Sequence, residues 1–367
     1  MSMKIVIDAR FFGTETGIGR YVKELIENLE KIDSVNNYVV FLRKENFNLY
    51  QPKKDNFEKK LADIKWYSLA EQFSFRKMVD AEKANLAHFP NFNVPVFCRT
   101  PYVVTIHDLI LRHFPTSAAS TKNPVIFYLK YFLYNFVLRR AVRDSKKIIA
   151  PTYFVKNDIL KNFRINPDKI RVISEGLSNL PPVDLGEEFL KTKNIAKPYI
   201  LYVGNCYPHK NLEKLIEAFN FLKNPELKLV LVGKRDYFSK NLELRVTNYE
   251  LKKNIIFYGY ASDSELSTLY KHAALYAFPS LMEGFGLPPL EAMSFNLPVA
   301  CSDIPALHEV LGESVFYFNP KSAKDMADTL ALVLSGAKPK KEGALILSRY
   351  SWRKNASETN EIYTKFN

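Results

Sequence analysis

The stretch YILYVGNCYPHKNLEKLIEAF, residues 199–219, decides the fold class of this 367-residue chain. It starts as a short apolar run, turns at Gly204, and continues from Asn211 with apolar residues spaced three and four positions apart. This order is typical of a buried parallel strand that leads through a turn into a helix. The stretch therefore predicts one strand–turn–helix unit of a doubly wound α/β sheet.

The same alternation recurs along the chain, which predicts parallel sheets with helices on both faces. Short apolar runs extend from Lys4–Asp8 to Val315–Phe318, and we expect Ile64–Ser68 to be one of the strands. Residues 178–197 interrupt the pattern with adjacent prolines and a charged stretch. We therefore expect two domains of similar size, residues 1–185 and 186–350, with the last helical stretch, 351–367, packed back on the first.

The composition excludes several classes of protein. With 47% hydrophobic and 25% charged residues, the chain is neither a disordered tail nor a fibrous repeat. Its three distant cysteines exclude a disulfide scaffold and a zinc finger, and they fit a reducing compartment. The chain shows no basic segment followed by an apolar stretch at its start, and no apolar run of about 18 residues. We therefore expect a cytoplasmic protein without a signal peptide or a spanning helix.

Positive charge is concentrated in one part of the chain. The formal net charge is +13, and residues 96–180 hold 14 basic against 5 acidic residues. Such a one-sided field favours an anionic partner, either nucleic acid, anionic lipid or a phosphorylated substrate. The alternative is a solvated lysine-rich surface. Nucleic acid is disfavoured because the aromatic runs look like core rather than like stacking residues between basic ones.

One aromatic stretch in this basic region suits a membrane surface. Residues 126–143 form a helical pattern that ends in the basic cluster Arg139, Arg140, Arg143, Lys146 and Lys147. If this end is exposed, it can lie against anionic lipid, which predicts a peripheral protein at the inner face of the plasma membrane. The other hypothesis is a buried helix of a large domain, with a solvated basic end.

Ligands of doubly wound sheets bind beyond the carboxyl ends of the strands, so the strand-to-helix turns are the candidate sites. In the first domain, Gly17-Ile18-Gly19 precedes a helix and permits close approach to an anion. It is not a full G-x-G-x-x-G because Val22 takes the third position, which argues against a nicotinamide oxidoreductase. His107, beside an aspartate, follows an apolar strand and is a second candidate.

The second domain carries the richer pattern. Lys210 lies in the last turn before a helix, where added positive charge is favourable only beside an anion such as phosphate. Further on, EGFGLPPLEAM places Glu283 and Glu291 around a helix start rich in glycine and proline. This layout matches a nucleotide-diphosphate sugar, which has hydroxyls at both ends and phosphates in the middle.

These motifs resemble those of glycosyltransferase family 4, the retaining group 1 enzymes with the GT-B architecture. The most specific match is Glu283 and Glu291, eight positions apart, and GIGRYVKEL, TIHDLI and YVGNCYPHKNLEKLIEAF match in order and spacing. The resemblance implies two doubly wound, Rossmann-like domains that face a cleft. It puts the acceptor on the side of residues 1–185 and the nucleotide-sugar donor on residues 186–350.

The resemblance also implies roles for single residues. We expect Glu291 to bind ribose hydroxyls, Glu283 to contact the transferred sugar and Lys210 to neutralise the leaving diphosphate. His107 is expected to approach the donor sugar from the first domain. Further donor contacts are expected from the backbone N–H groups of Phe285, Gly286 and Leu287 and from the loops at Gly17 and Asn205.

The chain departs from the family pattern at three positions. Many members have arginine where this chain has Asn205 and His209, so Lys210 is expected to carry more of the phosphate charge alone. Many have glycine where Asn296 stands, and asparagine tolerates the left-handed conformation of a helix end.

The implied reaction is the transfer of a hexosyl unit with retention. A lysine and helix N-termini can stabilise a leaving diphosphate without a metal, and neither candidate site holds Asp-x-Asp, so we expect no metal or other cofactor. The PHKNL stretch resembles bacterial mannosyltransferases and favours GDP-mannose as donor. The expected acceptor is a lipid-linked or glycan intermediate of lipopolysaccharide O-antigen or capsule. A UDP-hexose transferase and a sugar-nucleotide epimerase of the same fold remain the alternatives.

Overall fold

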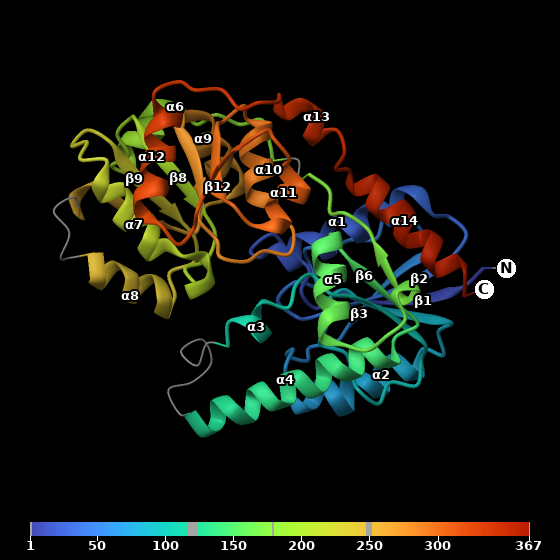
Figure 1. Ribbon diagram of the computed structural model, residues 1–367. Coiled ribbons are helices and arrows are strands. Elements are labelled where there is room, and N and C mark those ends of the chain that lie inside the picture. Colours follow the sequence, from blue (N-terminus) through green and yellow to red (C-terminus); the bar gives the residue numbers. More distant parts are fainter. Residues whose placement is uncertain (1, 116–123, 178–179, 247–251, 367) are drawn as a thin grey trace. The chain divides into compact units, whose positions relative to one another are not determined.

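The computed structural model describes residues 2–115, 124–177, 180–246 and 252–366, which form two compact α/β units (Figure 1). Within these residues, the first unit runs to Arg112, continues from 124 to Gly176 and takes in the chain from Tyr350 on. The second unit holds residues 113–115 and the described part of Leu177–Arg349. Both units are parallel sheets flanked by helices, which confirms the predicted fold class of two Rossmann-like domains.

The first unit is built on a seven-stranded parallel sheet in the order β3-β2-β1-β4-β5-β6-β7. Its strands are β1 (Lys4–Asp8), β2 (Asn37–Leu42), β3 (Phe57–Leu61), β4 (Leu86–Phe89), β5 (Tyr102–Thr105), β6 (Lys147–Ala150) and β7 (Ile170–Val172). Its helices are α1 (Gly17–Ile32), α2 (Arg76–Ala81), α4 (Pro124–Asp144), α5 (Tyr153–Asn162) and α14 (Trp352–Thr364), while α3 (Ile110–His113) lies at the boundary between the units.

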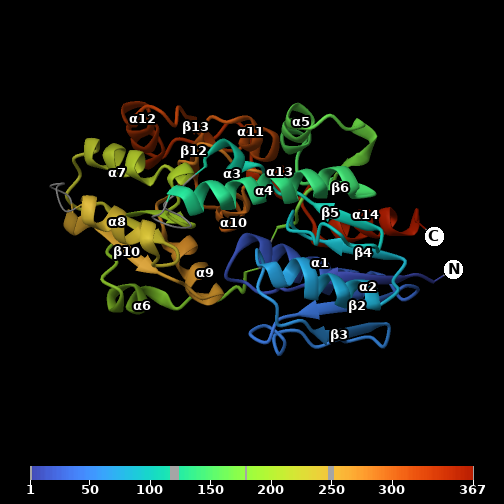
Figure 2. The same cartoon turned by 90° about the horizontal axis from the view of Figure 1, so that it is seen from below.

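The second unit is built on a six-stranded parallel sheet in the order β10-β9-β8-β11-β12-β13. Its strands are β8 (Tyr199–Val203), β9 (Lys228–Val232), β10 (Ile255–Gly259), β11 (Leu275–Phe278), β12 (Val299–Ser302) and β13 (Phe316–Phe318). Its helices are α6 (Gly186–Thr192), α7 (Leu212–Phe221), α8 (Tyr237–Val246), α9 (Asp263–His272), α10 (Leu287–Ser294), α11 (Pro305–Leu311), α12 (Ala323–Leu334) and α13 (Gly343–Leu347). Figures 1 and 2 together place α7 and α12 on one face of this sheet and α9 on the other.

Helices cover both faces of the first sheet because its strand residues alternate between two cores. One core joins Val104 of β5 to Leu138 of α4 and Ile159 of α5. On the other face, the Tyr21 hydroxyl of α1 lies 3.2 Å from the hydroxyl oxygen of Thr105. There α14 packs against α1. None of the helices that the structure describes is long and apolar enough to cross a membrane.

The strand predicted at Ile64–Ser68 is wrong. The structure has β3 at Phe57–Leu61, where FEKKL pairs with β2 at the edge of the sheet. Edge strands often carry charged side chains, which oppose pairing with another chain. A search for uniformly apolar runs therefore misses β3. Ile64 follows it in irregular backbone, and its carbonyl accepts a hydrogen bond from the Arg10 guanidinium at 3.2 Å.

The chain leaves the first unit at Gly176, earlier than the boundary expected at residue 185, and returns to it at Tyr350. The proline-rich segment already belongs to the second unit, because the Pro181 carbonyl accepts a hydrogen bond from Ser267 at 2.7 Å. The C-terminal helix α14 lies in the first unit. There Asn355 donates to the carbonyl of Ser174 at 2.8 Å, just beyond β7.

Candidate active site

The two candidate loops of the second unit follow neighbouring strands. β8 and β11 pair in parallel, while β9 and β10 lie on one side of them and β12 and β13 on the other. Doubly wound sheets bind ligands beyond the carboxyl ends of the strands at such a reversal of strand order. The loop with Lys210 follows β8 and the loop with Glu283 follows β11, so the topology brings these loops to one point.

Close backbone packing holds the turn after β8. A Cβ on Gly233 would lie 1.9 Å from the carbonyl oxygen of Gly204, so the turns after β8 and β9 can approach this closely only with glycine at Gly233. Asn205 shapes the same turn, because its side-chain oxygen accepts a hydrogen bond from the Tyr207 N–H at 3.2 Å.

Hydrogen bonds tie the turn after β8 to the loop after β11. Asn211, at the start of α7, has φ 59° and donates from its side chain to the carbonyl of Pro279 at 3.1 Å. The backbone N–H of Leu281 donates to the carbonyl of His209 at 2.7 Å. The position of Lys210 relative to the second loop is therefore fixed by hydrogen bonds of both flanking residues, His209 and Asn211.

Lys210 and Glu283 form an ion pair at this junction. The Lys210 Nζ lies 2.6 Å from the Glu283 Oε1, and the two side chains are only 14% and 9% exposed. The ammonium also lies 5.4 Å from the centre of the Phe278 ring at the end of β11. Two residues predicted separately from sequence thus share one contact, and their roles toward a ligand stay predictions.

His209 adds no positive charge beside Lys210 at neutral pH. Burial and, next to it, the charge of the neighbouring Lys210 ammonium lower the pKa of its imidazole to about 4. Asn205, four positions before His209 in the same loop, is neutral, so Lys210 is the cation among these three residues. That this lysine meets the charge of a phosphate stays a prediction.

The loop after β11 ends in a glycine-dependent helix start. Gly286 has φ 98°, a conformation that favours glycine, and a Cβ there would lie 2.9 Å from a methyl carbon of Leu307, which would have to shift. α10 begins at the next residue with prolines in its first turn. Glu291 is 5% exposed within α10 and accepts a hydrogen bond from the Tyr270 hydroxyl at 3.2 Å. Beyond α10, Asn296 has φ 55°, the left-handed conformation expected of it.

In the first unit, Gly17 is the first residue of α1. Thr16 caps this helix by accepting a hydrogen bond from the Gly19 N–H at 3.0 Å. A Cβ on Gly17 would meet no atom within 4 Å. The packing of the chain itself does not require glycine at this position, and the predicted role in ligand approach stays a prediction.

Both ring nitrogens of His107 face acceptor oxygens. Nδ1 lies 2.9 Å from the Glu175 carboxylate and Nε2 lies 2.9 Å from the carbonyl of Pro90. Two acceptors need two N–H donors, so this geometry holds the ring as an imidazolium. Burial lowers the pKa of His107, but the hydrogen bond and charge of Glu175 outweigh it and leave the pKa raised. A sugar contact through either nitrogen requires one of these bonds to open.

Two family models match the chain in the order of its two units. The model described as Glycosyltransferase Family 4 matches residues 16–178, and the model described as Glycosyl transferases group 1 matches residues 187–357. The chain belongs to glycosyltransferase family 4. Within this glycosyltransferase, the described residues contain no group of three or more His, Cys, Asp or Glu side chains that could hold a metal ion. Independence from metal stays a prediction.

Named relatives of this glycosyltransferase include two O-antigen chain enzymes. It is 29% identical to the O-antigen chain mannosyltransferase RfbU of Salmonella typhimurium, over 72% of this chain and 69% of that protein. It is 25% identical to O-antigen chain mannosyltransferase B of Escherichia coli, over 95% and 96%. Among solved structures, the sucrose-phosphate synthase from Thermosynechococcus elongatus superposes with a TM-score of 0.78 at 18% identity, over 99% and 98% of the two chains. That likeness supports the GT-B fold.

Glu175 is the residue of this glycosyltransferase that sequence reasoning missed. It lies just beyond β7, is 6% exposed, and binds His107, 68 positions earlier. The available signal was a lone glutamate that follows a short apolar strand and precedes Gly176. Glu175 sets the charge and orientation of the His107 ring, which makes it a positioning residue.

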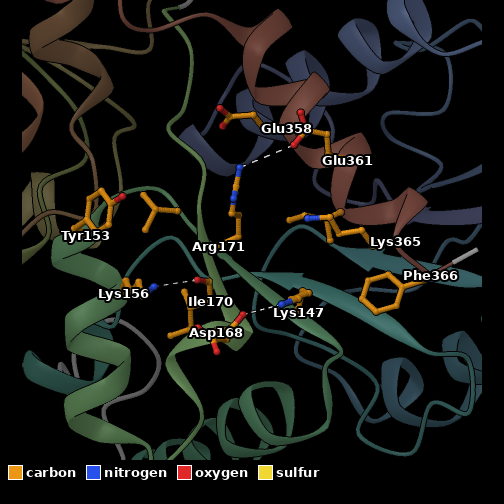
Figure 3. A pocket seen from close by; sticks show the side chains of 12 residues that line it. Lys147, Tyr153, Lys156, Asp168, Ile170, Arg171, Glu358, Glu361, Lys365 and Phe366 are labelled. Atoms are coloured by element: carbon orange, nitrogen blue, oxygen red, sulfur yellow. Dashed lines mark hydrogen bonds and ion pairs between the residues drawn. The ribbon is translucent and has the colours of Figure 1, made fainter.

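A pocket of about 510 Å³ in the first unit of the enzyme lies elsewhere (Figure 3). Residues after β6, at β7 and on α14 line it, and none of the predicted site residues is among them. Lys147 and Lys156 donate to backbone carbonyls there, and Arg171 faces Glu361 at 3.9 Å. Since the two lysines already donate to carbonyls and the arginine faces a carboxylate, we assign no ligand to this pocket.

Proposed function

We propose that this glycosyltransferase transfers a mannosyl unit from GDP-mannose, with retention, to a lipid-linked or glycan acceptor of lipopolysaccharide O-antigen or capsule synthesis. The observation that carries the proposal is the Lys210–Glu283 ion pair beside the Gly286 helix start, at the carboxyl ends of β8 and β11. The mannosyl unit and the O-antigen are supported by the names of the two mannosyltransferases to which the chain is similar.

In the proposed complex, each group of the second unit meets one part of the donor. Glu291 accepts hydrogen bonds from the ribose hydroxyls, and backbone N–H groups at the start of α10 bind the diphosphate. A lysine ammonium moves on a flexible stem, so Lys210 can leave Glu283 for the diphosphate. Glu283 then accepts hydrogen bonds from the hydroxyls of the mannosyl unit.

The proposed reaction breaks the bond between the anomeric carbon and the diphosphate oxygen, which keeps the electron pair. Lys210 and the N–H groups stabilise the negative charge that develops on this oxygen. The acceptor hydroxyl forms the new bond on the same face of the sugar, and its proton passes to the departing phosphate. This route retains configuration without a covalent enzyme intermediate and requires no metal.

A donor panel tests the proposal. The purified chain is heated with GDP-mannose, UDP-glucose or UDP-galactose, since a ligand that binds the folded state raises the melting temperature. Each labelled donor is then incubated with and without a lipid extract from O-antigen-producing bacteria. We expect stabilisation by GDP-mannose, transfer of label to lipid, and a product whose anomeric configuration by NMR equals that of the donor.

Other outcomes name the alternatives. Stabilisation and transfer only with a UDP-sugar would identify a UDP-hexose transferase of the same family and overturn the mannosyl proposal. Conversion of a sugar nucleotide to its epimer without any acceptor would overturn transfer itself. An inverted product would remove the same-face mechanism but leave the donor assignment in place.

A further inference from the structure

The outer face of α4 carries a continuous stripe of apolar side chains. Helix positions separated by three and four residues share a face. Five such positions hold aromatic or leucine side chains that are between 42% and 68% exposed, and we call them the outer stripe: Tyr128, Leu129, Phe132, Leu133 and Phe136. Apolar patches of this kind on a folded protein mark binding surfaces more often than chance.

The opposite face of α4 fixes the direction of this stripe. Leu138, Ala141 and Val142 are fully buried in the core of the first unit. Nearer the start of the helix, Arg112 donates to the side-chain oxygen of Asn135 at 2.7 Å. Figure 1 shows the first turns of α4 projecting away from the sheet of their unit, and Figure 2 shows α4 in front of that unit. The hypothesis of a wholly buried helix is therefore wrong for the outer stripe.

The outer stripe continues into a basic cluster. Arg139 and Arg143 follow Phe136 at the same helical spacing, and residues 139–147 hold five basic residues and one acidic residue. That acidic residue, Asp144, pairs with Arg140 at 2.7 Å and with Arg143 at 2.8 Å. The cluster therefore stays strongly positive beside the apolar stripe.

A loop extends the same surface. Phe97, between β4 and β5, is 54% exposed and lies 5.9 Å from the guanidinium carbon of Arg140. Arg99 is exposed two residues further on. Aromatic rings and arginines side by side suit the boundary between lipid tails and headgroups, because each offers an apolar body and a polar end.

We infer that the outer stripe, with its basic cluster, is a surface that binds an anionic lipid bilayer. The apolar side chains enter the headgroup boundary, and the arginines meet lipid phosphates. A second copy of this chain fits less well, because the outer stripe and the two arginines that extend it include no carboxylate to pair with those arginines. The inference concerns a surface outside the donor site, so it stands apart from the identity of the donor.

Vesicle flotation tests the inference. The full chain is mixed with phosphatidylcholine vesicles, with or without phosphatidylglycerol, at about 50 and 500 mM salt. We expect flotation with the anionic vesicles at low salt and much less at high salt, because salt screens the attraction. Flotation that is indifferent to lipid charge and salt overturns the inference, and so does the absence of flotation.

Matched variants distinguish vesicle binding through the outer stripe from nonspecific binding by other exposed residues. Phe132→Ser with Phe136→Ser is expected to reduce binding by more than about tenfold, and Arg139→Gln with Arg143→Gln by about thirtyfold. The controls, Leu332→Ser with Leu345→Ser and Lys240→Gln with Lys338→Gln, change similarly exposed residues of the second unit and should bind as wild type. Equal losses in variants and controls contradict the inference.

A spectroscopic probe reports contact at α4 directly. Tryptophan emission shifts to the blue when an apolar environment surrounds the ring, so Phe132→Trp is expected to show a blue shift with anionic vesicles after subtraction of the wild-type spectrum. Leu345→Trp is the control without a shift. Concentration-dependent dimerisation that Phe132→Ser abolishes, without vesicle binding, would assign the stripe to a second copy instead.

Discussion

In both sheets, oppositely charged side chains lie where the strand order reverses. The two clusters differ in how their cations are bonded. In the first unit, Asp8 ends β1, and Arg10, fully buried, bonds Asp8 at 2.7 Å and Glu71 at 2.6 Å. In the second unit, β8 and β11 end in two loops that meet through Lys210 and Glu283. Each unit thus places opposite charges beyond its central strands.

The difference lies in how many bonds each cation makes. Arg10 also donates to the carbonyl of Ile64, and its guanidinium carbon lies 3.8 Å from the centre of the Phe75 ring. Its guanidinium therefore contacts a carbonyl and a ring in addition to the two carboxylates. Lys210 has one carboxylate partner and a flexible stem, and it can exchange that partner for a phosphate. We therefore expect the first cluster to stabilise its unit and the second to bind the donor.

Removal of the Arg10 charge should break the first cluster and give the largest effect. Arg10→Met leaves Asp8 and Glu71 buried without a cation, which is expected to cost about 3–5 kcal/mol of unfolding free energy. Both tryptophans of the chain, Trp66 and Trp352, lie in the first unit, so urea unfolding followed by tryptophan fluorescence reports this unit.

The control adds Asp8→Asn and Glu71→Gln to the same variant. With no uncompensated charge left, we expect most of the lost stability to return. If Arg10→Met alone unfolds at the wild-type urea concentration, the cluster does not have the structural role assigned to it.

Removal of the Lys210 or Glu291 charge in the second unit should keep the fold intact and remove the transfer activity. Lys210→Ala and Glu291→Ala are each expected to lower the transfer rate by about 10²–10³-fold, because they remove contacts to developing or bound charge. Lys214→Ala is the matched control, since Lys214 lies on α7 and pairs with Glu217 at 2.7 Å. Wild-type turnover in either folded site variant would disprove the site assignment.

The Lys210–Glu283 contact predicts coupling between the two residues. We expect Glu283→Ala to reduce turnover while GDP affinity is mostly kept, since Glu283 is assigned to the sugar. The double variant Lys210→Ala with Glu283→Ala should lose less unfolding free energy than the sum of the single variants, with a coupling of about 1–3 kcal/mol. Additive losses would show that the ion pair does not form in solution.

The sequence brought together the charged residues of the second unit but not those of the first, because the signals in the second unit are local. Glu283, Gly286 and Glu291 lie within one loop and one helix, so their spacing alone places them on one helix start. Glu175 and Glu71 reach His107 and Arg10 across 68 and 61 positions, and no periodic pattern reports a pairing of that kind. Contacts between distant residues also decide which face of α4 is exposed. The sequence showed the aromatic content of this helix but not which of its faces would pack against the core.

The smallest expected effect is the change in unfolding free energy with pH that the protonation of His107 causes. The direction of this change follows from the raised pKa of His107. The pKa of His107 is raised in the folded state, so its pair with Glu175 stabilises the first unit fully below the ordinary imidazole pKa of about 6.5. This stabilisation is lost as the pH rises through the raised pKa. Wild type should therefore lose more stability than Glu175→Gln as the pH rises above about 6.5. His88 is neutral throughout this window, because burial lowers its pKa to about 3. Parallel pH profiles of the two proteins would show that His107 is not held as an imidazolium.

The central claim is that the second unit holds the nucleotide through Glu291, and calorimetric titration of GDP tests it most directly. We expect wild type and His107→Gln to bind GDP alike, and Glu291→Ala to bind at least about tenfold more weakly, because a charge-assisted hydrogen bond is lost. Equal affinity of wild type and Glu291→Ala, or a loss confined to His107→Gln, would contradict the claim.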